Sequence, residues 1–194
     1  MSKKLQCPIR TPNIINITII LFITILLCTA MTLTVNAESA TAEDYYNNGM
    51  THVKLKEHEQ AIADFNKAIA LNPQYVEAYF IRGKVYYSSK KYDLAIADFN
   101  KMIAVNPQNS DAYFNRGIVY DTLNQLDKAI ADFDQAIAIN PQNKVVFFVR
   151  GIAYNRLENY IKAIDDFSHL IELSPKDAMA YFNRGYAYAG LHQY

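Results

Sequence analysis

Residues 110–143 read SDAYFNRGIVYDTLNQLDKAIADFDQAIAINPQN, and this stretch decides the fold. Its first half places Tyr113 and Gly117 four residues apart, which is the spacing of neighbours on one face of an α-helix. Its second half places Ala129 and Phe133 at the same spacing. The residues between the two halves are polar enough for a turn, so the stretch predicts a pair of helices joined by a short connection.

The same pattern recurs along the chain every 34 residues. The recurring glycines are Gly49, Gly83, Gly117, Gly151 and Gly185, and the recurring prolines are Pro73, Pro107, Pro141 and Pro175. A fixed period of this length indicates stacked supersecondary units. The units are 42–75, 76–109, 110–143, 144–177 and a partial fifth, 178–194. A residue before proline is pushed out of the helical region, so each Asn-Pro or Ser-Pro step ends a helix. Asn109, Asn143 and Asp177 then stand at the N-cap of the next helix.

Glycine in a helix interior costs about 1 kcal/mol relative to alanine, so its recurrence needs a compensating contact. The second half of each unit carries recurring small and aromatic residues: Ala61, Ala95, Ala129, Ala163, Phe65, Phe99, Phe133 and Phe167. We expect the glycine and the alanine to let the two helix backbones approach closely, with aromatic rings at the flanks. One such pair cannot bury its apolar faces alone, so neighbouring units must stack.

These positions resemble the tetratricopeptide repeat. The likeness is carried by Gly, Tyr, Ala, Phe, Ala and Pro at the eighth, eleventh, twentieth, twenty-fourth, twenty-seventh and thirty-second positions, as in AYFNRGIVY and KAIADFDQAIAINPQ. It covers residues 42–194. The resemblance implies an all-α, right-handed solenoid of helix–turn–helix units whose first helices line a concave groove. It also implies that the protein binds another polypeptide and does not catalyse a reaction.

The groove positions implied by the resemblance give a predicted peptide-binding set. Its members are Tyr46, Phe80, Lys84, Phe114, Asn115, Ile118, Phe148, Ile152 and Phe182. The fifth position of every unit in this set is aromatic, which suits a row of rigid anchors for a peptide. The same rings could instead pack between first helices as part of the core, and the sequence leaves both interpretations open.

Charge along these positions suggests the chemistry of the partner. Glu43, Glu77 and Asp111 lie toward the N-terminal end, whereas Val145 and Met179 lie toward the C-terminal end. This predicts a mixed partner segment, basic at one end and apolar at the other, although ordinary surface variation would look the same. A clamp for a C-terminal carboxylate, known in part of the family, is not expected, because only Asn115 matches its pattern.

Residues 1–37 read as a secretory signal that begins with a short basic start and continues into an apolar stretch. Val35-Asn36-Ala37 resembles a cleavage site, and 38–41 would be a linker. An uncleaved membrane anchor and a lipoprotein acylated at Cys28 are the alternatives. The protein is therefore expected to be exported, either to the periplasm or the exterior or as an outward-facing anchored protein.

The remaining features give no sign of catalysis or of a cofactor. The sequence has no HExxH or GxSxG motif, and both cysteines lie in the leader, so no metal or cofactor is expected. Zero net charge gives no reason to expect a nucleic-acid partner. A membrane contact is expected only through an uncleaved leader.

Recurring arginines and aspartates predict either a structural charge ladder or a row that reads acidic segments. The arginines are Arg82, Arg116, Arg150 and Arg184, and the aspartates are Asp64, Asp98, Asp132 and Asp166. Tyr194 stands where a second helix would begin, so we expect a fragment of a longer protein, or a last helix that associates with something else. A substrate-recruiting front end of a longer enzyme is the alternative function.

Overall fold

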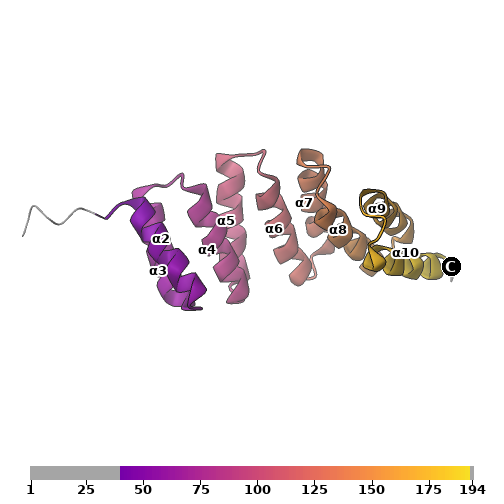
Figure 1. Ribbon diagram of the computed structural model, residues 1–194, viewed down its shortest axis with the longest axis horizontal. Helices are drawn as coiled ribbons and strands as arrows, with labels where there is room; N and C mark the ends of the chain where they lie inside the picture. The colour runs from indigo at the N-terminus through magenta and orange to yellow at the C-terminus, as the bar shows by residue number, and fades with distance from the viewer. Residues whose placement is uncertain (1–39, 193–194) are drawn as a thin grey trace, which may run out of the picture. The chain divides into compact units, whose positions relative to one another are not determined.

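The structure, a computed structural model, describes residues 40–192 and contains only α-helices there. The helices are α2 (Ala42–Lys54), α3 (His58–Leu71), α4 (Val76–Ser88), α5 (Tyr92–Val105), α6 (Ser110–Thr122), α7 (Leu126–Ile139), α8 (Lys144–Arg156), α9 (Tyr160–Leu173) and α10 (Ala178–Leu191). They form successive hairpins, α2 with α3 through α8 with α9, and each hairpin packs on the next (Figure 1). The all-α expectation is confirmed for these residues, while the predicted signal helix in residues 1–37 lies outside them.

The first helices α2, α6, α8 and α10 begin at a side-chain cap, whereas α4 begins after Tyr75 without one. Asn109 accepts a hydrogen bond from the Ala112 backbone N–H at 3.0 Å, and Asp177 accepts bonds from two backbone N–H groups at the start of α10. Asn143 caps α8 in the same way. These bonds satisfy donors that the first turn of a helix leaves free. The three predicted N-caps are confirmed.

The turn inside each hairpin uses a left-handed residue that is never glycine. Lys56, Lys90, Asn124 and Glu158 have φ values between 57° and 62°. After α4, the Lys91 N–H donates to the Tyr86 carbonyl at 2.8 Å and the Lys90 N–H donates to the Tyr87 carbonyl at 2.9 Å. This is the Schellman pattern of helix termination. A non-glycine residue in this conformation costs about 1–2 kcal/mol, and nothing in the sequence pattern predicted it.

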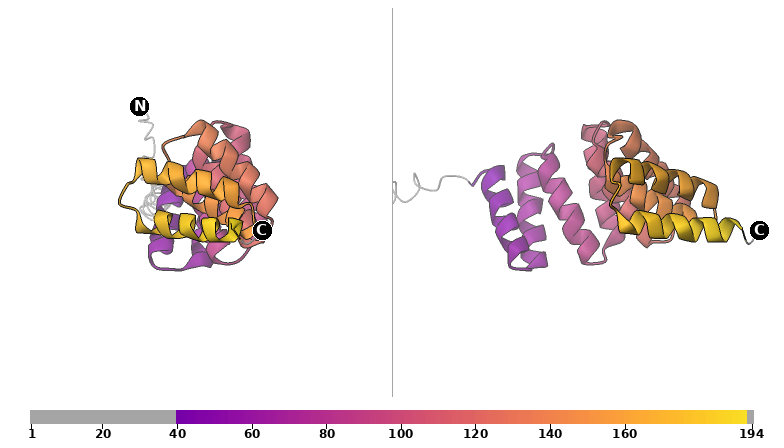
Figure 2. Two further views of the ribbon diagram at one scale, coloured as in Figure 1. Left: turned by 90° about the vertical axis from the view of Figure 1, so that its right-hand side faces the viewer. Right: turned by 45° about the vertical axis from the view of Figure 1, so that its right-hand side comes forward.

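The core runs along the hairpins and is centred on one phenylalanine per second helix. Phe65, Phe99, Phe133 and Phe167 are at most 1% exposed, and the four predicted packing alanines of the same helices are fully buried. Successive hairpins are visible from the side in Figure 2. No helix within residues 40–192 has the length and apolar character needed to cross a bilayer.

The glycines make room for these phenylalanine rings. A Cβ added at Gly49, Gly83, Gly117 or Gly151 would lie only 2.6–2.9 Å from a carbon of the ring on the paired helix. The expected glycine–alanine approach is a smaller effect, seen where the Ala129 carbonyl lies 3.3 Å from such a Cβ at Gly117. The glycine is therefore needed mainly because the ring occupies the space of its missing side chain.

Two of the packing predictions are wrong. Gly185 has no described atom within 4 Å of an added Cβ, because no described second helix faces α10 on that side. The four recurring prolines, Pro73, Pro107, Pro141 and Pro175, are exposed at the turns between hairpins. They end helices, as their chemistry requires, but they contribute nothing to the core.

Candidate peptide-binding site

The first helices α2, α4 and α6 border a cavity of about 410 Å³, which we call the α4 cavity. Met50 lines it from α2, Ile81 and Lys84 from α4, and Asn115 and Ile118 from α6. Its lining is mostly apolar and includes a few polar side chains, among them a lysine, an amide and a histidine, which is the usual make-up of a site that binds organic groups. Three of the predicted residues, Lys84, Asn115 and Ile118, are thus brought together in one cavity.

A smaller, acidic pocket lies on the other side of Phe80. It has a volume of about 160 Å³ and lies between α4 and α6, with Glu77 and Asp111 in its lining. Met102 of α5 also contributes to it. Two carboxylates beside an aromatic ring favour a cationic side chain, because both the charges and the ring face attract one.

The C-terminal helices carry two further pockets. One, of about 280 Å³, is lined by Val145 and Phe148 of α8 and Met179 of α10. The other, which we call the α8–α10 cavity, has a volume of about 410 Å³ and is lined by residues that include Ile152 and Phe182. The predicted residues Phe148, Ile152 and Phe182 therefore line this end of the first-helix surface.

The aromatic residues at the fifth position pack on the core and also remain partly accessible. Phe114 lies 6.2 Å from the ring of Phe133, and Phe148 lies 6.2 Å from the ring of Phe167. Tyr46 contacts Phe65 in the same way, at 5.8 Å between ring centroids. The packing interpretation therefore holds for these three rings, which stay only half-buried, and the anchor interpretation remains a prediction.

Phe182 and Phe80 complete this ladder with different surroundings. Phe182 is 69% exposed, since α10 has no described second helix to supply a phenylalanine beneath it. Phe80 is half-buried, and the Lys84 ammonium lies 5.2 Å from its ring centroid. Lys84 is therefore held over an aromatic face at the rim of the α4 cavity.

Sequence reasoning missed several residues of the α4 cavity. Ile81 occupies the sixth position of its unit, and His58 and Ser88 come from a second helix and a helix end. Their inclusion depends on how far each hairpin is rotated against the next, which the repeat period does not specify. Val53 and Tyr87, which stand at a groove-facing twelfth position implied by the family resemblance, also line the cavity.

The recurring arginines form a structural ladder. Arg116 donates through Nε and Nη2 to both carboxylate oxygens of Asp132, at 2.8 and 2.6 Å, and through Nη1 to Asn100 of the preceding hairpin at 2.5 Å. Arg82 and Arg150 repeat this arrangement. The hydrogen bonds that Arg116 donates to the Asp132 carboxylate raise the pKa of Arg116, so the guanidinium stays charged.

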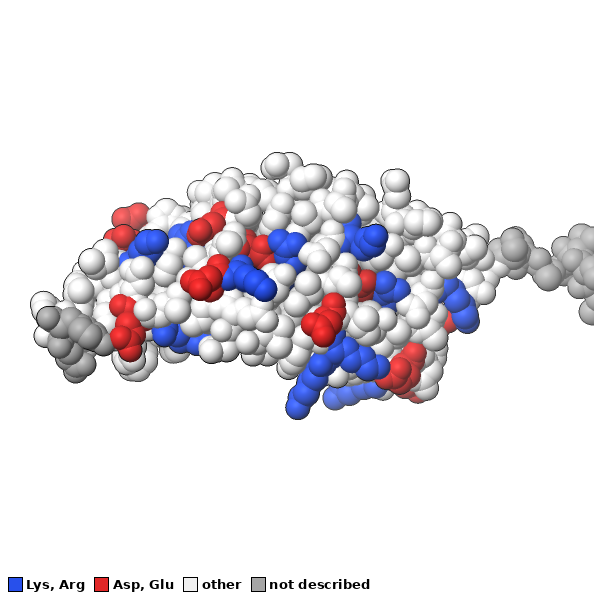
Figure 3. Space-filling model, turned by 180° about the vertical axis from the view of Figure 1, so that it is seen from behind, with Lys and Arg blue, Asp and Glu red and all other residues white. Residues whose placement is uncertain are grey.

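The hydrogen bonds of this ladder exclude the alternative interpretation of Arg82, Arg116 and Arg150, in which these side chains would bind an acidic segment. Their guanidinium groups are already bonded in both directions, so they are not available to read acidic or phosphorylated segments. On the face seen in Figure 3, basic and acidic side chains are interspersed along the described residues. Local pairs of opposite charge therefore dominate that face.

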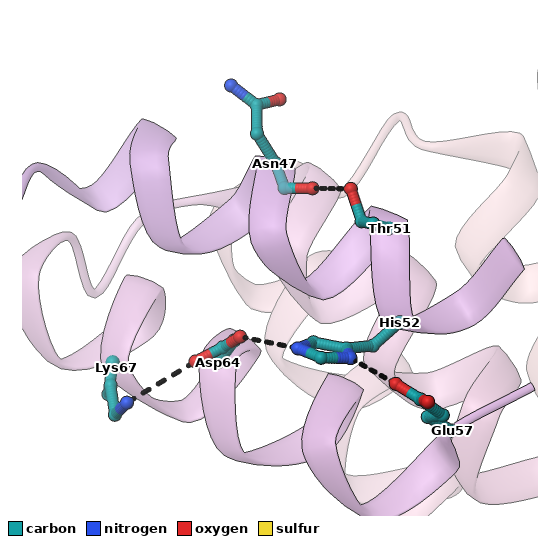
Figure 4. A network of polar contacts seen from close by, with 6 residues as sticks. All are labelled: Asn47, Thr51, His52, Glu57, Asp64 and Lys67. Carbon is teal, nitrogen blue, oxygen red and sulfur yellow. Dashed lines mark hydrogen bonds and ion pairs between the residues drawn. The ribbon is translucent and has the colours of Figure 1, made fainter. Parts of the chain in front are cut away.

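The first hairpin replaces the ladder with a histidine network, drawn in Figure 4. Asp64 has no arginine partner and instead lies 3.6 Å from His52 Nε2 and 3.3 Å from the Lys67 ammonium. His52 Nδ1 lies 2.6 Å from a carboxylate oxygen of Glu57. His52 is half-buried and its polar contacts are with the carboxylates of Glu57 and Asp64, so it lies at the edge of the first hairpin and not in its core. It belongs to no metal cluster among residues 40–192.

Comparisons with known proteins agree with this architecture. Sequence models described as tetratricopeptide repeat or TPR repeat match residues 49–89, 83–123, 110–143 and 146–177. Among curated proteins, no sequence matches.

Solved structures are similar in fold. YrrB, a TPR protein with an unusual peptide-binding site, has a TM-score of 0.69 and 26% identity over 82% of each chain. MamA from Desulfovibrio magneticus RS-1 has a TM-score of 0.67 and 26% identity, over 73% of this chain and 80% of that one.

A third structure, the first TPR of Spaghetti (RPAP3) bound to the HSP90 peptide SRMEEVD, covers 61% of this chain and 94% of its own, with a TM-score of 0.58 and 26% identity. The repeat models cover most of residues 49–177, and the hairpins carry the glycine and phenylalanine contacts in register. The chain therefore belongs to the tetratricopeptide repeat family and has the fold of a protein-interaction scaffold.

Proposed function

We propose that this chain is an exported tetratricopeptide-repeat scaffold that holds a segment of another polypeptide against its first helices. The observation that carries the proposal is the α4 cavity, which crosses three successive first helices and is mostly apolar. YrrB, a similar structure, is described as having a peptide-binding site, and the RPAP3 structure contains a bound peptide. These neighbours support a polypeptide as the partner.

The partner segment combines a basic residue with apolar residues. Glu77 and Asp111 line the pocket beside Phe80, so a lysine or arginine of the segment is stabilised there. Val145 and Met179 are 55% and 56% exposed at the other end, where they favour an aliphatic or aromatic side chain. The acidic peptide of the RPAP3 structure does not fit this charge pattern.

The α4 cavity supplies the binding energy and the acidic pocket supplies orientation. Apolar side chains that enter the cavity gain about 25 cal/mol for each Å² removed from water. Charges at a partly exposed rim contribute more to the rate and direction of association than to its strength. The Asn115 amide nitrogen donates to the Asp111 backbone carbonyl at 2.7 Å, which leaves the side-chain oxygen as the acceptor for a peptide N–H.

Export is supported by residues 1–37, which lie outside the described residues. A basic start, an apolar stretch and a small-x-small sequence before Glu38 are the parts of a cleavable signal. N-terminal sequencing of the mature protein should begin at Glu38, and a chain that keeps its leader would instead support a membrane anchor.

A peptide-array screen tests the binding proposal. Ile118→Glu places a charge in the α4 cavity at a half-buried residue that also packs on the core, so circular dichroism must show that the variant is folded; it should weaken binding of mixed basic and apolar peptides at least about tenfold. Leu94→Glu is the matched control, because Leu94 is 47% exposed on α5 and lines none of the described pockets. Equal binding by the Ile118→Glu variant, or an array that returns only acidic peptides, would overturn the proposal.

A further inference from the structure

Polar links join neighbouring first helices at fixed positions of the repeat. The twelfth residue of one unit contacts the thirteenth residue of the next unit. Between α4 and α6, the Tyr87 hydroxyl lies 3.0 Å from the Thr122 hydroxyl. Between α6 and α8, Arg156 Nη1 donates to the Asp121 carboxylate at 2.5 Å. At both boundaries the polar side chain at the twelfth position therefore has a partner on the next first helix.

The link is missing between α8 and α10. Asn155 holds the twelfth position of α8, but the thirteenth position of α10 is Gly190, which has no side chain. Its missing side chain makes room for Tyr160, since an added Cβ would lie 2.5 Å from that ring. Asn155 is only 8% exposed, and its oxygen Oδ1 has no hydrogen-bond partner among the described residues. A buried, unpaired oxygen of this kind costs stability unless another group donates to it.

The Asn155 amide lies at the α8–α10 cavity with its oxygen as the unpaired end. Asn155 lines that cavity, and its Nδ2 lies 3.5 Å from the backbone carbonyl of Asn183 on α10. Turning the amide over would set its oxygen against that carbonyl, so this contact determines its orientation. The oxygen is covered, so a ligand reaches it after a wall of the cavity moves. Tyr186 is the wall residue that can turn, because it is 58% exposed.

The α8–α10 cavity is a regular feature of the first-helix surface. The same repeat positions of α4 and α6 line the α4 cavity, where they are Tyr87, Ser88, Asn115 and Ile118. That place is open although α7 and α8 follow α6 in the chain. The α8–α10 cavity is therefore a second site of the same kind, with the Asn155 amide where the α4 cavity has a tyrosine.

The lining of the α8–α10 cavity favours an uncharged group that donates hydrogen bonds. The Asn183 amide nitrogen donates to a backbone carbonyl of its own helix at 2.8 Å, which leaves its oxygen as a second acceptor besides that of Asn155. The described residues that line the cavity include no acidic side chain, and they include Arg156, whose charge disfavours an ammonium or guanidinium group. Ile152 and Tyr186 supply apolar surface for the stem of such a group.

We infer that the α8–α10 cavity binds a carboxamide side chain, glutamine or asparagine, of the bound polypeptide segment. The NH₂ group of a carboxamide has two N–H donors, one for the oxygen of Asn155 and one for the oxygen of Asn183. A hydroxyl or a main-chain N–H has one donor, and a carboxylate has none. The inference rests on the proposed function, because the carboxamide belongs to the segment that the first helices hold.

A peptide array in which each position is varied among glutamine, leucine, glutamate and lysine tests the inference on the full chain. Wild-type protein should select glutamine at one position, and Gln→Leu, Gln→Glu and Gln→Lys there should each weaken binding at least about tenfold. The Asn155→Leu variant lacks the acceptor, so in it Gln→Leu should change binding less than about twofold. Asn48→Leu, at an exposed asparagine of α2, is the matched control and should keep the selection for glutamine.

Urea unfolding separates recognition from a structural role. Asn155→Leu exchanges an unpaired buried amide for an apolar side chain of similar size, so the variant should be at least as stable as the wild type. A clear loss of stability would assign Asn155 to packing and would count against the inference. Wild-type binding that prefers a basic residue at one position but is indifferent to glutamine, or that favours lysine over glutamine at this site, would refute the inference and leave the proposed function standing. An array that binds nothing would refute both.

Discussion

Replacing Gly117 with alanine should destabilise the array, although alanine is the better helix former. The added methyl group would lie 2.6 Å from Cε1 of Phe133 and 3.3 Å from the carbonyl oxygen of Ala129. Neither neighbour can easily move, because Phe133 is fully buried and the other atom belongs to the backbone of α7. The ring or the whole hairpin must therefore shift.

Two opposing terms determine the size of the effect. Overpacking a close-packed core costs about 1–3 kcal/mol. Removing a glycine from a helix interior returns about 1 kcal/mol. Because the added methyl group would lie 2.6 Å from a fully buried ring, the overpacking cost falls in the upper half of its range, and the net change for Gly117→Ala is a loss of about 1–2 kcal/mol. At Gly185 the first term is absent, because no described atom lies within 4 Å, so Gly185→Ala should stabilise α10 by about 0.5–1 kcal/mol.

Urea unfolding followed by circular dichroism measures both changes on the full chain. Native-state hydrogen exchange should accompany it, because repeat arrays need not unfold in one step. Amides of α6 and α7 should lose protection in Gly117→Ala, whereas amides of α10 should gain it in Gly185→Ala. The reasoning would be refuted if Gly117→Ala were as stable as the wild type, or if the two variants shifted stability in the same direction.

Two further predictions concern polar contacts. Asp132→Ala removes two of the three hydrogen bonds of Arg116 and should lower the free energy of unfolding by about 3 kcal/mol, the lower end for a broken buried pair, because the arginine side chain is 20% exposed. Exposed Gln135→Ala should change the free energy of unfolding by less than about 0.5 kcal/mol in the same urea experiment, and similar losses in the two variants would contradict a structural ladder. The Thr41 backbone N–H and hydroxyl donate hydrogen bonds to the Asp44 carboxylate and lower its pKa. The ionised carboxylate therefore stabilises α2 fully at pH values above the usual carboxyl pKa, and this stabilisation is lost as the pH falls through the lowered pKa of Asp44. Titration of Asp44 by NMR should show the lowered pKa. The prediction would be contradicted if the melting temperatures of the wild type and of Asp44→Asn had the same pH dependence between about pH 5 and pH 2.

The hairpins could be predicted from the sequence because their signals are local. Pro107 restricts the residue before it, and Asn109 can cap a helix only a few residues away, so both act over distances that the sequence shows directly. The phenylalanine ring over Gly117 was assigned only to the flank of the hairpin, because spacing alone does not say which side chain faces a glycine. The left-handed conformation of Lys90 could not be predicted from the sequence, because the helix-termination motif is made by backbone hydrogen bonds and tolerates many side chains.

The candidate site was less predictable because it depends on rotations between hairpins. Lys84 and Ile118 meet in the α4 cavity because both hold the ninth position of successive units, and Ile81 and Asn115, both at the sixth position, lie about one helical turn before them. His58 joins them only through the angle between neighbouring hairpins. The half-buried state of Phe114 likewise follows from its contact with Phe133, a distance that no single-sequence pattern specifies.

The arginine ladder ties each hairpin to the one before it. Because Arg116 joins α5 and α7 at once, pulling one hairpin out of line transmits force to a helix on each side of it. A force applied by a bound polypeptide would therefore be distributed over several hairpins. The array would bend a little at every boundary between hairpins, and no single boundary would act as a hinge.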